Sequence, residues 1–131
     1  MLENGDAFHL QLANKANIQA PQIFDLELIN GFQKMDYAVF WKTQEDIVTL
    51  TFKIGFQGAD IPAGTHIVSV LPEGYRPKTY LSHGSGTTFP HVEQPILIWI
   101  GSGGYLNIRV QNAIPAFEGA SVCGTLSFAA T

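Results

Sequence analysis

The alternation of side-chain character at positions 48–56 constrains the fold of this chain more than any other feature. Every second residue there is large and apolar, and the set is Val48, Leu50, Phe52, Ile54 and Phe56. The positions between them are mainly polar, with Thr49, Thr51 and Lys53. Successive side chains of a β-strand point to opposite faces, so this stretch is predicted to be a strand with one buried and one exposed face.

Short apolar stretches recur along the chain and are separated by turn residues. Further strands are predicted at Leu26–Ile29, Tyr37–Trp41, Ile67–Leu71, Ile96–Ile100, Tyr105–Val110 and Val122–Phe128. Gly or Asn marks the turns between several of them, as in Asn30-Gly31 and at positions 101–104. The polar stretch Lys78–Gln94 is predicted to be a long loop. Short strands without a convincing helix predict an all-β fold, an antiparallel β-sandwich or jelly roll.

The predicted strand at positions 96–100 is apolar on both faces. Isoleucine occupies one face at every second position, and Leu97 and Trp99 share the other face. Such a strand either lies centrally, covered on both sides, or packs against a partner subunit. Charged residues make up only 14% of the chain, below the usual proportion of about a quarter. This low proportion also favours a surface that is partly hidden in an assembly.

The apolar run that starts at Ile67 ends in a dense set of turn-forming residues. The motif comprises Leu71, Pro72, Glu73, Gly74, Tyr75, Arg76 and Pro77. Proline removes a backbone donor and holds the residue before it extended, and Gly74 permits a positive φ. Tyr75 can bury its ring while its hydroxyl reaches a polar partner. We predict a structural corner that locks two sheets together; the alternative is a direct ligand contact.

This motif occurs together with Asn30-Gly31 upstream, a Gly-rich turn downstream and the closing segment Gly124–Phe128. The combination resembles the C-terminal domains of phage and prophage tail-fibre and baseplate proteins, especially those of phages with Gram-positive hosts. The likeness spans Leu26–Phe128. It implies a homotrimeric β-sandwich head domain at residues 26–131, preceded by an N-terminal arm or shaft segment at residues 1–25. It also implies a virion protein of the tail tip or baseplate, synthesised in the bacterial cytoplasm, whose N-terminal segment contacts other tail or baseplate proteins.

Length, charge and cysteine content exclude several classes of protein. A chain of 131 residues forms one domain with a real core but not two. The net charge of −4 without any Lys/Arg cluster argues against a nucleic-acid partner. We expect no membrane insertion and no secretion, because neither a long apolar run nor a secretory signal pattern is present. The single Cys123 excludes an intrachain disulfide and a structural zinc site.

The sequence contains no clear constellation for catalysis. Ser82, His83 and Ser85 place hydroxyls beside an imidazole, but adjacent side chains of an extended segment point apart and a triad also needs an orienting acid. We favour the interpretation of His83 and His91 as ordinary surface histidines. The alternative is that the two form a metal-binding pair. We therefore expect no enzymatic activity, no cofactor and no metal site.

Residue types suited to sugar recognition occur in the second half of the chain. A sugar site needs an aromatic face and a few rigid hydrogen-bonding groups. The candidates are His83, His91, Trp99, Tyr105, Asn107 and Arg109. The last three are predicted to share the outward face of one strand, next to Trp99 across the hairpin. The alternative is that Trp99 belongs to the core or to a subunit interface and that Arg109 forms an ion pair at its rim.

Together with the resemblance, these observations favour a non-catalytic phage tail-tip module that recognises a saccharide of the host cell wall or cell surface. The alternative is a purely structural domain that trimerises a tail fibre or baseplate and binds no sugar. The two are hard to separate because the residues that suit a sugar site also suit a subunit interface. A hydrolytic tail enzyme is a third hypothesis.

Overall fold

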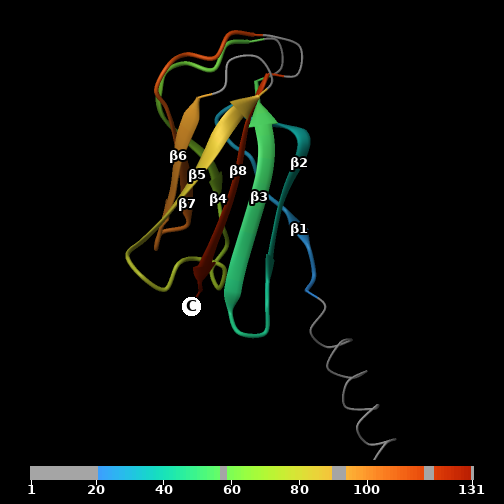
Figure 1. Cartoon of the computed structure of the whole chain (residues 1–131). Helices are drawn as coiled ribbons and strands as arrows, with labels where there is room; N and C mark the ends of the chain where they lie inside the picture. The colour runs from blue at the N-terminus through green and yellow to red at the C-terminus, as the bar shows by residue number, and fades with distance from the viewer. Residues whose placement is uncertain (1–20, 57–58, 90–93, 117–119, 131) are drawn as a thin grey trace, which may run out of the picture.

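The structure is a computed structural model, and it describes residues 21–56, 59–89, 94–116 and 120–130. All regular secondary structure in these ranges is β. The eight strands are β1 (Phe24–Asp25), β2 (Gln33–Lys42), β3 (Ile47–Gly55), β4 (Gly64–Val70), β5 (Leu81–Phe89), β6 (Pro95–Gly101), β7 (Tyr105–Val110) and β8 (Ser121–Ala129). They form one antiparallel sheet in the order β1-β2-β3-β8-β5-β6-β7-β4 (Figure 1). Within the same ranges the structure contains no helix that could span a membrane.

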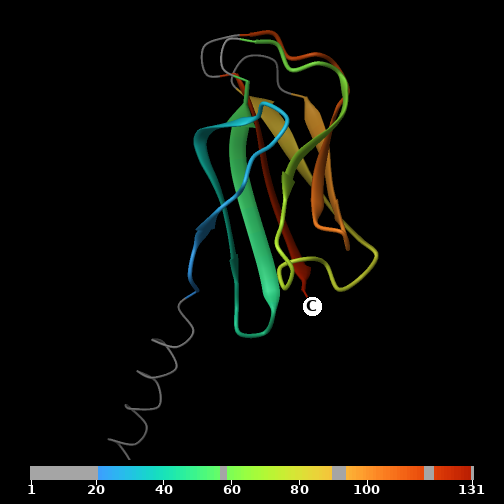
Figure 2. The same cartoon turned by 180° about the vertical axis from the view of Figure 1, so that it is seen from behind.

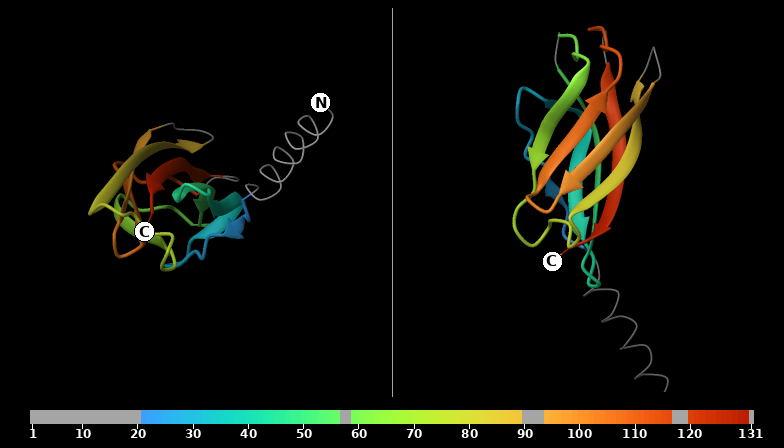
Figure 3. Two further views of the ribbon diagram at one scale, coloured as in Figure 1. Left: turned by 90° about the horizontal axis from the view of Figure 1, so that it is seen from below. Right: turned by 90° about the vertical axis from the view of Figure 1, so that its left-hand side faces the viewer.

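The sheet curls until its two edge strands approach each other. Leu28, which follows β1, forms a bridge with Ser69 of β4. One residue later, the Ile29 N–H donates a hydrogen bond to Val68 O at 3.0 Å. Seen from below, the strands surround a common interior (Figure 3). This arrangement confirms the predicted all-β, antiparallel fold.

The alternating apolar residues of the strands fill this interior. On β3 the predicted buried face is confirmed, because the side chains of Val48, Leu50, Phe52 and Ile54 are fully buried. The facing wall is made by buried residues of β6 and β7, namely Ile96, Ile98, Ile100, Leu106, Ile108 and Val110. Ile98 lies so close to Gly124 of β8 that a Cβ atom at this glycine would overlap its side chain. The two walls of the curled sheet therefore interlock.

The strand predicted at Leu26–Ile29 is wrong in position. The first ladder lies earlier, at Phe24 and Asp25, which pair with β2. The N–H of Leu26 still donates to a β2 carbonyl oxygen at 2.8 Å, whereas the N–H of Ile29 donates to β4. This segment therefore crosses from one edge of the sheet to the other, and a segment that changes partner cannot form one regular ladder. The turn that follows is present, since both Asn30 and the next residue have positive φ.

The predicted loop at Lys78–Gln94 is wrong for its central part, which forms β5 between β8 and β6. Glycine is disfavoured in strands, so the composition of β5 resembles that of a loop. The glycines permit close approach to β8. A Cβ atom at Gly86 would overlap the carbonyl oxygen of Cys123, and one at Gly84 would lie 2.8 Å from Leu126 Cδ1. Tertiary packing therefore requires residues that local propensity disfavours.

The motif that begins at Leu71 forms a corner after β4, beside the lower end of β8 (Figure 2). Gly74 adopts a φ of 89° in this corner. The Leu71 N–H donates to Gly104 O at 2.8 Å. Pro77, at the end of the motif, forms a bridge with Ala130. The corner thereby joins β4 to the β6–β7 turn and to the C-terminal end of β8.

Tyr75 anchors the corner in a cluster of aromatic rings. Its ring lies edge-on to Phe24 and Phe40, with centroid separations of 5.8 and 5.3 Å. The Lys42 ammonium lies 4.9 Å from the centroid of the Tyr75 ring and donates a hydrogen bond to Gly74 O at 2.8 Å. These contacts tie the corner to β1 and β2.

Tyr75→Ala is expected to lower the free energy of unfolding by about 2 kcal/mol, because it removes a half-buried ring from this cluster. Thermal denaturation followed by circular dichroism measures the loss. Tyr80→Ala is the matched control, since Tyr80 is 86% exposed and has no ring contact with another described residue. Equal melting temperatures for the two variants would contradict the anchoring role of Tyr75.

Candidate functional site

Three neighbouring strands bring candidate residues into one row. His83 of β5 lies opposite Trp99 of β6, and Trp99 lies opposite Asn107 of β7. Neighbouring strands are about 4.8 Å apart, so these three positions are adjacent across the sheet. The residues before and after Trp99, Ile98 and Ile100, are fully buried. Because side chains alternate along a strand, the row lies on the outward face of the sheet.

A second row runs beside the first. Leu97 of β6 lies opposite Arg109 of β7 and, on its other side, opposite Ser85 of β5. Tyr105 lies on the same face of β7, two residues before Asn107. We call this surface the β5–β6–β7 face, and it comprises His83, Ser85, Leu97, Trp99, Tyr105, Asn107 and Arg109. The register thus brings together every predicted site residue except His91, which lies outside the described residues.

The polar groups of this face are accessible to a ligand. Arg109 is exposed and forms no ion pair with any described residue. The Asn107 side chain is oriented by a hydrogen bond from Nδ2 to Tyr105 O at 3.0 Å. Trp99 is half-buried and Tyr105 is 52% exposed. The rim ion pair considered for Arg109 therefore has no partner within the described part of the chain.

The same face also exposes aliphatic side chains. Leu97 is 47% exposed, and Ile67, which lies opposite Asn107 on β4, is 37% exposed. Within the described part of the chain, the outer side of β6 is therefore only partly covered. Exposed aliphatic residues beside aromatic ones are typical of a surface that contacts another molecule.

Neither catalysis nor metal binding is favoured by the groups around His83. Consecutive residues of a strand face opposite sides, so Ser82 does not share the face of His83. Ser85 does share it, but the described residues of β5, β6 and β7 include no Asp or Glu to orient an imidazole. Among the described residues, no three His, Cys, Asp or Glu side chains are grouped closely enough to hold a metal ion.

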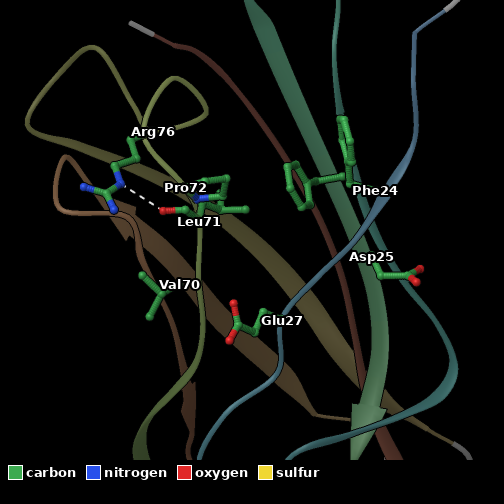
Figure 4. A pocket seen from close by; sticks show the side chains of 8 residues that line it. Phe24, Asp25, Glu27, Val70, Leu71, Pro72 and Arg76 are labelled. Carbon is green, nitrogen blue, oxygen red and sulfur yellow. Dashed lines mark hydrogen bonds between the residues drawn. The ribbon is translucent and has the colours of Figure 1, made fainter.

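A second feature lies at the seam where the two edges of the curled sheet approach. A cavity of about 380 Å³ opens between β1 and the corner after β4 (Figure 4). We call it the seam cavity, and it is lined by Phe24, Asp25, Glu27, Phe40, Val70, Leu71, Pro72 and Arg76. No sequence pattern indicates this cavity, because its walls come from segments that are far apart in the chain.

Charges of both signs line the seam cavity. Arg76 Nε donates to Leu71 O at 2.9 Å, which holds the guanidinium on the side of the corner (Figure 4). Glu27 contributes a carboxylate from the opposite side, whereas the carboxylate of Asp25 points away from Arg76 (Figure 4). Both residues are exposed. None of these three charged groups forms an ion pair with a described residue. The cavity therefore offers unpaired donors and acceptors beside apolar walls.

Two solved structures have a similar fold. The head domain of lactococcal phage bIL170, a receptor-binding domain, matches with a TM-score of 0.62 at 14% sequence identity, over 85% of this chain and 99% of that one. The receptor-binding protein of Listeria phage PSA matches with a TM-score of 0.64 at 15% identity, over 96% of this chain and 77% of that one. At these identities the likeness concerns the fold. No protein-family model and no curated protein sequence matches the chain.

Proposed function

We propose that this chain is the receptor-binding head domain of a bacteriophage tail and that its β5–β6–β7 face binds a saccharide on the surface of a Gram-positive host. The observation that carries the proposal is the row of His83, Trp99 and Asn107 across three strands, with Arg109 in the adjacent row. The folds shared with receptor-binding proteins of two phages support the setting. The protein would then act at the tail tip of the virion.

The chemistry of the face suits a saccharide. A sugar ring has an apolar C–H face, which packs on an aromatic ring, and a rim of hydroxyls, which need rigid donors and acceptors. Trp99 and Tyr105 provide the aromatic surface, and Asn107 provides an amide whose orientation is held by a hydrogen bond. Arg109 suits a hydroxyl or a phosphate oxygen, so a neutral saccharide and a glycerol-phosphate polymer both fit.

Binding without catalysis is part of the proposal. The face contains imidazole and hydroxyl groups but, among its described residues, no carboxylate. Hydrolysis of a glycosidic bond ordinarily requires a pair of carboxyl groups placed across the bond. The face is thus better suited to holding a polysaccharide than to cleaving it.

An array of purified host-wall polysaccharides and control glycans tests the proposed function. We expect the protein to bind wall polysaccharide and to adsorb to host cells whose surface proteins have been removed by protease. Each site is expected to be weak, because a shallow exposed surface retains little free energy after ordering costs. Adsorption that disappears after protease treatment, with no signal on the array, would contradict a saccharide receptor.

We also propose that the protein forms a homotrimer. The alternative function is a purely structural assembly domain that trimerises and binds no sugar. The specific observation in favour of the trimer is the exposed aliphatic surface at Leu97 and Ile67. Association about a threefold axis would bury these aliphatic side chains and leave the polar groups of the three faces at the edges of the interface. The N-terminal segment, residues 1–25, would join the head to other tail or baseplate proteins.

Leu97→Asp is expected to convert the trimer to monomers, because it removes an apolar contact and places a charge in the interface, where even a pair with the neighbouring Arg109 does not recover the cost of desolvation. Sedimentation equilibrium should give three times the chain mass of 14.3 kDa for the unaltered protein and one chain mass for the variant. Ile47→Asp is the control, since Ile47 is a similarly exposed aliphatic residue on β3. An unaltered protein that is monomeric at micromolar concentration would end the trimer proposal.

A further inference from the structure

We propose that the seam cavity is a second binding site, separate from the β5–β6–β7 face, and that it takes one protonated amino sugar. This inference rests on the proposed saccharide-binding function and adds a site with a different charge preference. The cavity lies directly beyond the face, because Val70, which lines it, is paired with Tyr105 of that face. One polysaccharide chain can therefore reach both sites.

The first argument is the rigid aromatic wall. Phe24 lies at the cavity with its ring 5.5 Å from that of Phe40 and 5.8 Å from that of Tyr75, measured between centroids. Rings packed in this way lose little further freedom when a ligand binds. Phe24 thus provides a preformed apolar surface for the C–H face of a sugar ring. A volume of about 380 Å³ is at the small end of the range for ligand pockets and suits a single ring.

The second argument is charge. One carboxylate, that of Glu27, points toward the side of the cavity that holds the Arg76 guanidinium. Because neither of these groups is paired with a described residue, a ligand that satisfies both walls must combine a cation with hydrogen-bond acceptors. An amino sugar does so, since its ammonium group suits the Glu27 carboxylate and its hydroxyl oxygens accept from Arg76. A phosphorylated or acidic sugar has an anionic group for Arg76 but no cation for Glu27, which would stay unpaired.

The seam cavity and the β5–β6–β7 face therefore differ in preference. On the face, Arg109 is the charged group and no described carboxylate accompanies it. Neutral or phosphate-bearing units fit there, whereas amine-bearing units fit the cavity. Two sites of different preference would select a polymer by composition, and their binding free energies would add when one chain occupies both.

Chemical-shift mapping of the isotope-labelled full chain tests this inference. Glucosamine at pH 6, where its amine is protonated, is expected to shift the backbone amide signals of Asp25, Glu27 and Arg76. Glucose and N-acetylglucosamine keep the ring but lack the charge, and both are expected to bind about tenfold more weakly. Equal shifts for the three sugars, or no shift at these residues with glucosamine, would overturn the proposal.

Two variants separate this site from the proposed face. Glu27→Gln removes one charge and keeps the shape of the side chain, and it is expected to weaken glucosamine binding about tenfold. Arg109→Gln, the control, should leave glucosamine binding unchanged and weaken binding to wall polysaccharide. Unchanged glucosamine affinity in Glu27→Gln would overturn the seam site alone. Unchanged polysaccharide binding in Arg109→Gln would count against the face and leave the seam site standing.

Discussion

Gly86→Ala is expected to lower the free energy of unfolding by about 3 kcal/mol and the melting temperature by roughly 10 °C. A Cβ atom at this position would overlap the carbonyl oxygen of Cys123 in the neighbouring strand β8. A backbone atom cannot rotate away as the end of a flexible side chain can, so β5 and β8 must move apart. Because β5 connects β8 to β6 in the sheet, this movement disturbs the middle of the fold. Denaturant and thermal unfolding measure the effect.

Gly101→Ala is the matched control for this variant. Gly101 is also a strand glycine, but the nearest atom to an added Cβ would be Tyr80 O at 3.7 Å, an ordinary contact. We expect its stability to stay within about 0.5 kcal/mol of the unaltered protein. If Gly86→Ala were as stable as this control, β5 would not pack against β8 as described. The row of His83 and Trp99, which depends on the register of β5, would then also be in doubt.

Trp99→Ala is expected to reduce adsorption to host cells by about 100-fold or more. Loss of one aromatic contact costs each site roughly tenfold in affinity. The loss is multiplied when several sites of the proposed trimer bind one surface. The melting temperature should change much less than in Gly86→Ala, because Trp99 is half-buried on the outward face. Adsorption assays with matched protein concentrations measure the effect.

Tyr37→Ala provides the control for the loss of an exposed aromatic ring. Tyr37 is 39% exposed and belongs to β2. In the sheet, three strands (β3, β8 and β5) lie between β2 and β6, the strand that contains Trp99. The Tyr37→Ala variant should adsorb to host cells as strongly as the unaltered protein. Adsorption that persists in a Trp99→Ala, Arg109→Ala double variant would remove the face as the receptor site. Loss of adsorption together with dissociation into monomers would instead assign Trp99 to the subunit interface.

The parts of the fold that were predicted correctly depend on patterns within single strands. The period of two in β3 identifies its buried face, which includes Leu50 and Phe52, without knowledge of any partner strand. The turn at Asn30 was predictable because its dipeptide favours positive φ. The outward position of Arg109 followed from the same alternation, since Ile108 and Val110 are both buried.

The errors occurred where a segment takes its conformation from distant neighbours. β5 has the composition of a loop, and only the close approach of β8 explains why Gly84 and Gly86 lie in a strand. The segment after β1 has the sequence pattern of a single strand, but the Leu26 N–H donates to β2 and the Ile29 N–H donates to β4. These cross-strand contacts produce no pattern within the segment itself, because the partner residues lie elsewhere in the sequence.

Local chemistry was therefore sufficient to predict an all-β chain and most of its buried faces, and to identify residue types that suit a sugar site. The packing of the whole chain was required to align His83, Trp99 and Asn107 in one row and to bring Arg76 to the same cavity as Glu27. The physical reason is that side-chain alternation is a property of one strand. Cross-strand register and the closure of a curled sheet arise only from contacts between segments that are distant in the sequence.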